Sequence, residues 1–102
     1  MAAAIDSRKR EVARAVVVSC SRQLRNDADD ADAWHALGVA LAALGNRVGA
    51  FTAFRNAILL DGDRAKTQLA LGKLLFDTGR VDDALRCFDC ATRDLSASID
   101  DS

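Results

Sequence analysis

Two stretches decide the fold of this chain: residues 34–41, Trp-His-Ala-Leu-Gly-Val-Ala-Leu, and residues 50–57, Ala-Phe-Thr-Ala-Phe-Arg-Asn-Ala. Their skeleton returns 34 residues further along the sequence. The identical pairs are Ala36 and Ala70, Leu37 and Leu71, Gly38 and Gly72, Leu41 and Leu75, Gly45 and Gly79, Ala50 and Ala84, Phe54 and Phe88, and Ala57 and Ala91; Asp27, Asp29 and Ala31 also recur as Asp61, Asp63 and Ala65. A fixed period of about 20–50 residues is typical of stacked repeats. We therefore expect a repeat architecture.

Apolar residues recur at helical spacing within and around each unit, and short polar stretches, all but the first containing glycine, separate these runs. The first helix has Asp6 or Ser7 as its expected cap and carries an apolar stripe through Val12, Val16, Cys20 and Leu24. The spacing predicts five helices, at about residues 7–26, 31–43, 47–60, 64–77 and 81–95. We expect a single domain over residues 1–98, composed of an N-terminal helix (1–26) and two repeat units (31–64 and 65–98), with an acidic tail at 99–102.

The composition is that of a helical, globular chain, with half of the residues hydrophobic and no proline. The net charge of −1 gives no strong field toward nucleic acid, which is a poor candidate partner. No apolar run approaches the roughly 18 residues that span a bilayer, and the N-terminus lacks the apolar core of a signal peptide. Three cysteines, an odd number, favour a reducing, cytoplasmic location.

At this point the residues resemble a known family. The two units resemble tetratricopeptide repeats, whose pattern runs W-x2-L-G-x2-Y, then A-x3-F, then A. The matching positions are Trp34, Leu37, Gly38, Leu41, Ala50, Phe54 and Ala57 in the first unit, and Gln68, Leu71, Gly72, Leu75, Ala84, Phe88 and Ala91 in the second. The departures are Leu41 and Leu75 for tyrosine, Gln68 for tryptophan, and Gly62 and Ser96 where proline is common. The resemblance implies an all-α, right-handed superhelix of about five antiparallel helices.

The pattern has a packing rationale. Glycine in the middle of a helix costs about 1 kcal/mol relative to alanine, which makes sense at Gly38 and Gly72 if the other helix of each hairpin crosses there. Ala50 and Ala84 are the expected small residues on the crossing side, with Phe54 and Phe88 as the large ones. Trp34 is expected to be buried with them.

Proteins of this family are binding scaffolds in which the first helix of each hairpin lines a concave groove. Carried over to this chain, that geometry assigns the groove to Asp32, His35, Val39 and Ala42 from the first unit, and to Lys66, Leu69, Lys73 and Phe76 from the second. Such a mixed surface suits an extended or helical peptide with some acidic character. Some members clamp the C-terminal carboxylate of chaperones. Lys66 fits one clamp position, but Ala36, Val39 and Ala70 replace the asparagine or arginine that the others need, so the clamp is disfavoured.

Both ends of the array carry apolar residues with no following helix in this sequence to cover them. On the last helix these residues, expected to form an open-end association site, are Leu85, Phe88, Thr92 and Leu95. Uncovered apolar edges mark association sites. Burial of an end by a second copy or by a larger partner is therefore an open hypothesis.

Candidate chemistry is sparse. Cys87 and Cys90 offer half of a metal or redox site, but a zinc site needs about four ligands, and the other candidates, Cys20 and His35, are far off in sequence. His35 has no Ser or Cys partner at recognisable spacing. The basic run at Arg8, Lys9 and Arg10 is read first as a solvated helix face, with an acidic partner, RNA or a membrane surface as alternatives. We predict no metal, no cofactor and no catalysis.

The leading hypothesis is a non-catalytic protein-interaction module: a small adaptor, chaperone or assembly subunit with a protein or peptide partner. The alternative is a self-assembling structural subunit whose open ends stack on one another. Concentration-dependent size separates the two hypotheses.

Overall fold

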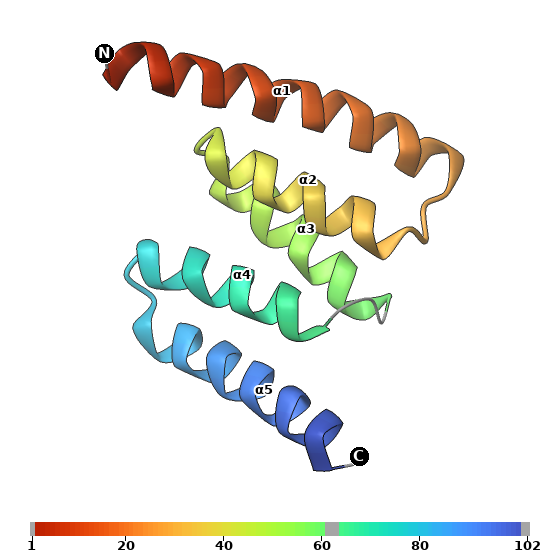
Figure 1. Cartoon of the computed structure of the whole chain (residues 1–102), viewed down its shortest axis with the longest axis vertical. Coiled ribbons are helices and arrows are strands. Elements are labelled where there is room, and N and C mark those ends of the chain that lie inside the picture. Colours follow the sequence, from red (N-terminus) through yellow and green to blue (C-terminus); the bar gives the residue numbers. More distant parts are fainter. Residues whose placement is uncertain (1, 61–63, 101–102) are drawn as a thin grey trace.

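The computed structural model describes residues 2–60 and 64–100, with side chains described at 7–60 and 65–93. Within these ranges the chain forms five α-helices and no strand. They are α1 (Ala2–Asn26), α2 (Ala31–Ala43), α3 (Arg47–Leu59), α4 (Arg64–Asp77) and α5 (Val81–Asp100). Each helix packs antiparallel against the next along the chain (Figure 1). The predicted all-α class is confirmed.

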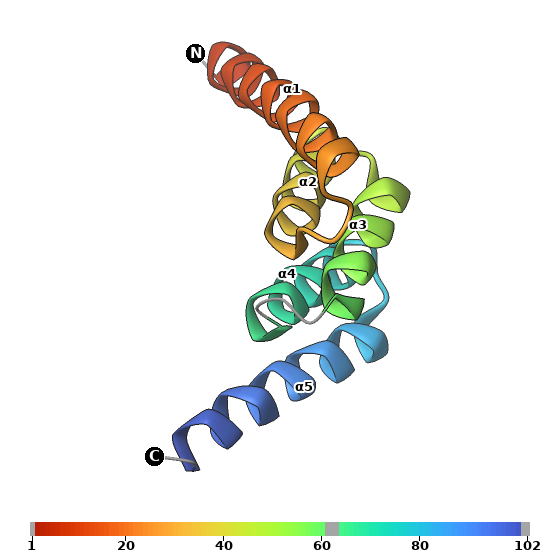
Figure 2. The same cartoon turned by 90° about the vertical axis from the view of Figure 1, so that its right-hand side faces the viewer.

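The helices are stacked along an arc. In Figure 2, α2 and α4 lie on the inner side of the arc, α3 lies on the outer side, and the long helices α1 and α5 flank the opening. The first helices of the two hairpins, α2 and α4, therefore share one side of the molecule. Residues from these two helices are the ones available to line an inner surface.

Three expected helix features differ from the structure. Helix α1 already begins at Ala2, so Asp6 and Ser7 lie within the helix instead of capping it. Helix α5 continues to Asp100, past its expected end near Leu95 and into the expected tail; residues 101–102 lie outside the described residues. Val12 is exposed because the face of α1 that packs on α2 is centred on Ala13 and Cys20, which are buried.

Both hairpins end their first helix in the same way. Gly45 and Gly79 have φ values of 82° and 86°, the left-handed conformation that glycine adopts without steric cost. The amide of the following residue returns to the carbonyl five residues earlier: Asn46 donates to Leu41 at 2.9 Å, and Arg80 donates to Leu75 at 2.9 Å. This is the Schellman motif. The repeated glycines thus set two equivalent turns.

Side-chain caps fix where α2 and α3 begin. The Asp30 carboxylate accepts a hydrogen bond from the Ala33 amide at 3.0 Å, and the Asn46 side chain accepts one from the Gly49 amide at 2.9 Å. Each bond satisfies an amide that has no partner inside the helix, worth about 1 kcal/mol.

The crossing of helices within each hairpin is close, as the glycines predicted. A Cβ atom added at Gly38 would lie 2.6 Å from both Cδ1 and Cε1 of Phe54, and one added at Gly72 would lie 2.7 Å from Cε1 of Phe88. Ala50 and Ala84 are fully buried in the same core. The rings of Phe54 and Phe88 thus fill the space that the absent side chains leave.

Trp34 is half-buried, not buried as expected. Its indole Nε1 donates to the carbonyl oxygen of Ala28 at 2.9 Å, which ties α2 to the preceding turn. Trp34 therefore stabilises the fold through this hydrogen bond as well as through partial burial of its ring.

Candidate functional site

A hollow of about 440 Å³ is lined by residues of α1, α2, α3 and α4. Two of these helices, α2 and α4, form the inner side of the arc (Figure 2). The volume of this inner hollow falls within the range of about 300–1,000 Å³ that is typical of ligand pockets. The apolar part of its lining includes Val39 on α2, which is 49% exposed, and the buried side chains of Phe54 and Leu74. The full lining is Lys9, Val39, Ala42, Ala43, Gly45, Arg47, Phe54, Ala70, Lys73, Leu74 and Asp77.

The charge in this inner hollow is mostly positive. Of its four charged side chains, Lys9, Arg47 and Lys73 are cations and Asp77 is the carboxylate. The three cations come from three different helices, α1, α3 and α4. An apolar lining with three cations and one carboxylate suits a segment that carries both apolar and acidic side chains.

The structure brings together some of the predicted groove residues and not others. Val39, Ala42 and Lys73 line the inner hollow. Leu69 and Phe76 are exposed on α4 without lining it, as are Asp32 and Lys66 on their helices. Val39, Leu69 and Phe76 still leave large apolar surfaces in contact with water, which is the property expected of a binding surface.

His35 links the two repeat units. Its Nδ1 lies 3.0 Å from Oγ1 of Thr67, and the ring centroids of His35 and Phe54 are 5.6 Å apart. Thr67 is only 3% exposed. The histidine predicted to contact a ligand is half-buried at the boundary between α2 and α4, where a hydrogen bond holds the units in register.

The predicted open-end residues differ in their surroundings. Leu85 is 59% exposed, whereas Phe88 is half-buried and packs on the core. Thr92 is exposed and donates its hydroxyl to the carbonyl of Phe88 at 2.9 Å; the side chain of Leu95 lies outside the described residues. Arg93 and Asp89 form an ion pair at 2.8 Å on the same helix. Much of the exposed side of α5 is thus polar and internally paired.

The cysteines do not assemble a reactive centre. Burial raises the pKa of the Cys20 thiol, with a further contribution from Asp30, and burial also raises the pKa of the Cys87 thiol, followed by contributions from Cys90 and Asp83. Raised pKa values keep thiols protonated and poorly nucleophilic. Among the side chains described, no three His, Cys, Asp or Glu residues lie close enough to hold a metal ion.

Sequence reasoning missed Lys9 and Arg47 as members of the inner site. Lys9 belongs to the basic run on α1 that was assigned to a solvated face, and Arg47 opens α3 just after a turn. The sequence showed that both residues are cations, but not where they lie. The packing of α1 on α2 and the turn at Gly45 place them in the same hollow as Lys73.

Within the described part of the chain, no helix combines the length and the apolar character that crossing a membrane requires.

Two stacked helical hairpins of matched design, with the first helix of each on the inner side of an arc, define a tetratricopeptide-type repeat fold. The chain is similar in structure to MamA, a tetratricopeptide-repeat protein, with a TM-score of 0.82 over 86% of this chain and 19% sequence identity. It spans about half of the MamA chain (52%). At this identity the match establishes the fold. No protein-family model matches the sequence, and no curated protein matches it either.

Proposed function

We propose that this chain is a non-catalytic protein-interaction module that holds an acidic segment of a partner protein in the inner hollow. The observation that carries the proposal is the meeting of Lys9, Arg47 and Lys73, from three helices, around one apolar-floored hollow. The partner segment would place its carboxylates against these cations and an apolar side chain against Val39.

The fold supports this reading because stacked helical hairpins present an extended surface and bind by shape and charge. Leu69 and Phe76, which are exposed on α4 outside the hollow, would offer further apolar contact to a partner segment that extends beyond it. A cytoplasmic location and self-association both stay predictions from the sequence.

The proposal is tested by selecting binders from a displayed library of random peptides. The selected peptides should carry a net negative charge. Raising the salt concentration should weaken their binding, because charge contacts near the surface are screened by salt. Lys73→Glu should weaken a selected peptide by about tenfold, since it replaces an attraction of up to about 1 kcal/mol by a repulsion of similar size.

Arg22→Glu is the matched control, because Arg22 is an exposed cation on α1 that does not line the inner hollow. It makes the same change in net charge. If both variants weaken the peptide equally, the effect comes from overall charge and the inner hollow is not the site. Selected peptides with no acidic bias would also contradict the proposal.

A further inference from the structure

A second hollow, of about 310 Å³, lies between the start of α3 and the end of α4. Its members on α3 are spaced one helical turn apart, so they share one face of that helix. Its lining is Arg47, Val48, Phe51, Thr52, Leu74, Leu75, Thr78 and Arg80. We call it the α3–α4 hollow. Arg47 and Leu74 line both hollows and so lie at the boundary between them.

The walls of the α3–α4 hollow are apolar in effect. Val48 and Phe51 form one side, and the buried side chains of Leu74 and Leu75 form the other. The two threonines turn their hydroxyl protons to their own helices: Thr52 donates to the Val48 carbonyl at 3.1 Å, and Thr78 donates to the Leu75 carbonyl at 2.9 Å. Neither hydroxyl proton is then directed at an occupant, so the hollow favours an apolar side chain.

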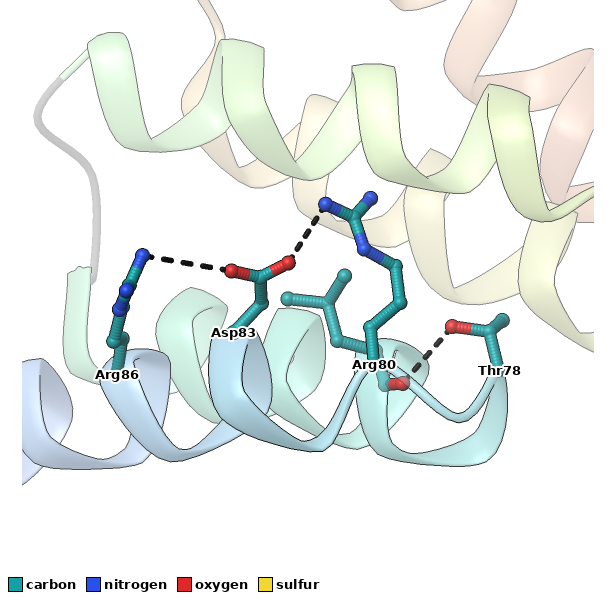
Figure 3. Close-up of polar contacts among 5 residues, drawn as sticks. Thr78, Arg80, Asp83 and Arg86 are labelled. Atoms are coloured by element: carbon teal, nitrogen blue, oxygen red, sulfur yellow. Dashed lines mark hydrogen bonds and ion pairs between the residues drawn. The ribbon is translucent and has the colours of Figure 1, made fainter.

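The rim of this hollow is cationic. Figure 3 shows the Arg80 side chain pointing toward α3. Its Nη2 lies 2.7 Å from Oδ2 of Asp83, a residue of α5. Arg86 approaches the other carboxylate oxygen at 3.7 Å. Asp83 therefore fixes the direction of Arg80 but is shared between two guanidiniums. No described carboxylate forms an ion pair with Arg47, and none of the described residues that line the hollow is acidic.

We infer that the α3–α4 hollow is a second docking site, adjoining the inner hollow at Arg47 and Leu74, for a bulky apolar side chain that lies next to a carboxylate in an acidic peptide of a partner protein. The apolar side chain fills the space between Val48 and Leu74, and the carboxylate meets Arg47 and Arg80. A volume near the lower end of the range for ligand pockets fits one large side chain and its neighbour. Guanidinium groups are well suited to carboxylates because they donate two parallel hydrogen bonds.

This inference goes beyond the proposed function, because it stands on residues of α3, α4 and the turn at 78–80 that the inner hollow, apart from Arg47 and Leu74, does not use. Either site can fail without the other. A ligand-sized probe is preferable to a peptide of unknown sequence, so the test uses hydrocinnamate, which joins a phenyl ring to a carboxylate. Phenylpropylammonium is the control probe, with the same ring and the opposite charge.

The experiment is a titration of the isotope-labelled protein followed by amide NMR. Hydrocinnamate should produce saturable shifts in residues 47–52 and 74–80, with a dissociation constant on the order of 1 mM, as expected for a ligand of this size. Phenylpropylammonium should produce much smaller shifts at the same amides.

Val48→Glu should abolish the saturable shifts, because it brings a carboxylate to the rim. Val48 is 80% exposed, so the substitution leaves the core intact. Val18→Glu, at an exposed valine on α1, is the matched control and should leave the titration unchanged. The inference is overturned if hydrocinnamate gives no saturable shifts, if it shifts only residues of the inner hollow, or if the two probes bind equally.

Discussion

For the replacement of Gly38 by alanine, the close crossing of α2 and α3 predicts a loss of stability, whereas helix propensity alone predicts a gain. On propensity alone, Gly38→Ala stabilises a helix interior by about 1 kcal/mol. The new Cβ atom, however, would lie 2.6 Å from two ring atoms of Phe54, a ring that is only 2% exposed and would have to shift against its core neighbours. Overpacking of a well-packed core costs about 1–3 kcal/mol, and two contacts this short place the cost near 3.

The expected net effect is a loss of about 2 kcal/mol in the free energy of unfolding, a large share of the total for a chain of this size. Gly38→Leu should prevent folding altogether. Urea unfolding followed by far-UV circular dichroism gives the number, with the fluorescence of Trp34 as a second probe of two-state behaviour.

Two further variants test the cause of the loss. Gly72→Ala should cost less, because its contact residue Phe88 is half-buried and can tilt outward. The double variant Gly38→Ala with Phe54→Leu should lose less free energy of unfolding than the two single variants lose together, because the smaller leucine side chain relieves the contact. A Gly38→Ala protein as stable as the parent, or more stable, would refute the reasoning.

The other predictions concern bonds that the structure places at helix ends and between repeats. Thr67→Val, at a nearly buried position bonded to His35, should lower the free energy of unfolding by about 1 kcal/mol, as measured in urea. Asp30→Ala removes the cap of α2 and should cost about 1 kcal/mol by the same assay, whereas Asp30→Asn should cost little. Cys90, exposed on α5, should react with iodoacetamide well before Cys20, as peptide mass mapping would show. Because the folded pKa of Cys20 is raised above its ordinary value of 9.0, the unfolded chain loses this proton first; stability should therefore fall as pH rises above about 9, and Cys20→Ala should remove part of that fall.

Much of the fold could be predicted because the sequence states it twice. The matched glycines Gly45 and Gly79 gave both turns, and their positive φ values follow from a local rule that needs no tertiary information. Gly38 and Gly72 indicated the helix crossings, since a mid-helix glycine is otherwise a cost. Repetition made these local rules reliable.

The first helix was harder to predict because it has no second copy in the sequence for comparison. Its four-residue stripe predicted that Val12 and Cys20 face inward; Cys20 is buried, but Val12 is exposed and the neighbouring Ala13 is buried in its place. A stripe of apolar residues every four positions drifts around a helix of 3.6 residues per turn. Only the contact with α2 decides which edge of that stripe is covered.

The candidate site was only partly predictable for a related reason. Val39 and Lys73 followed from repeat position, whereas Lys9 and Arg47 reach the inner hollow through the way that separate helices pack. The sequence placed His35 on the groove side of its helix, but its hydrogen bond to Thr67 depends on how one unit stacks on the next. The position of a residue in the repeat predicts which face of its helix it occupies. It does not predict which residues of the adjacent helices it contacts.

The most direct test of the central claim is to find which methyl groups a bound peptide touches. An acidic peptide selected from the library, mixed with methyl-labelled protein, should give intermolecular nuclear Overhauser effects to the methyls of Val39, Ala42 and Ala70, which line the inner hollow and not the α3–α4 hollow. Contacts confined to Leu85, which is exposed on α5 and does not line the inner hollow, would contradict the account.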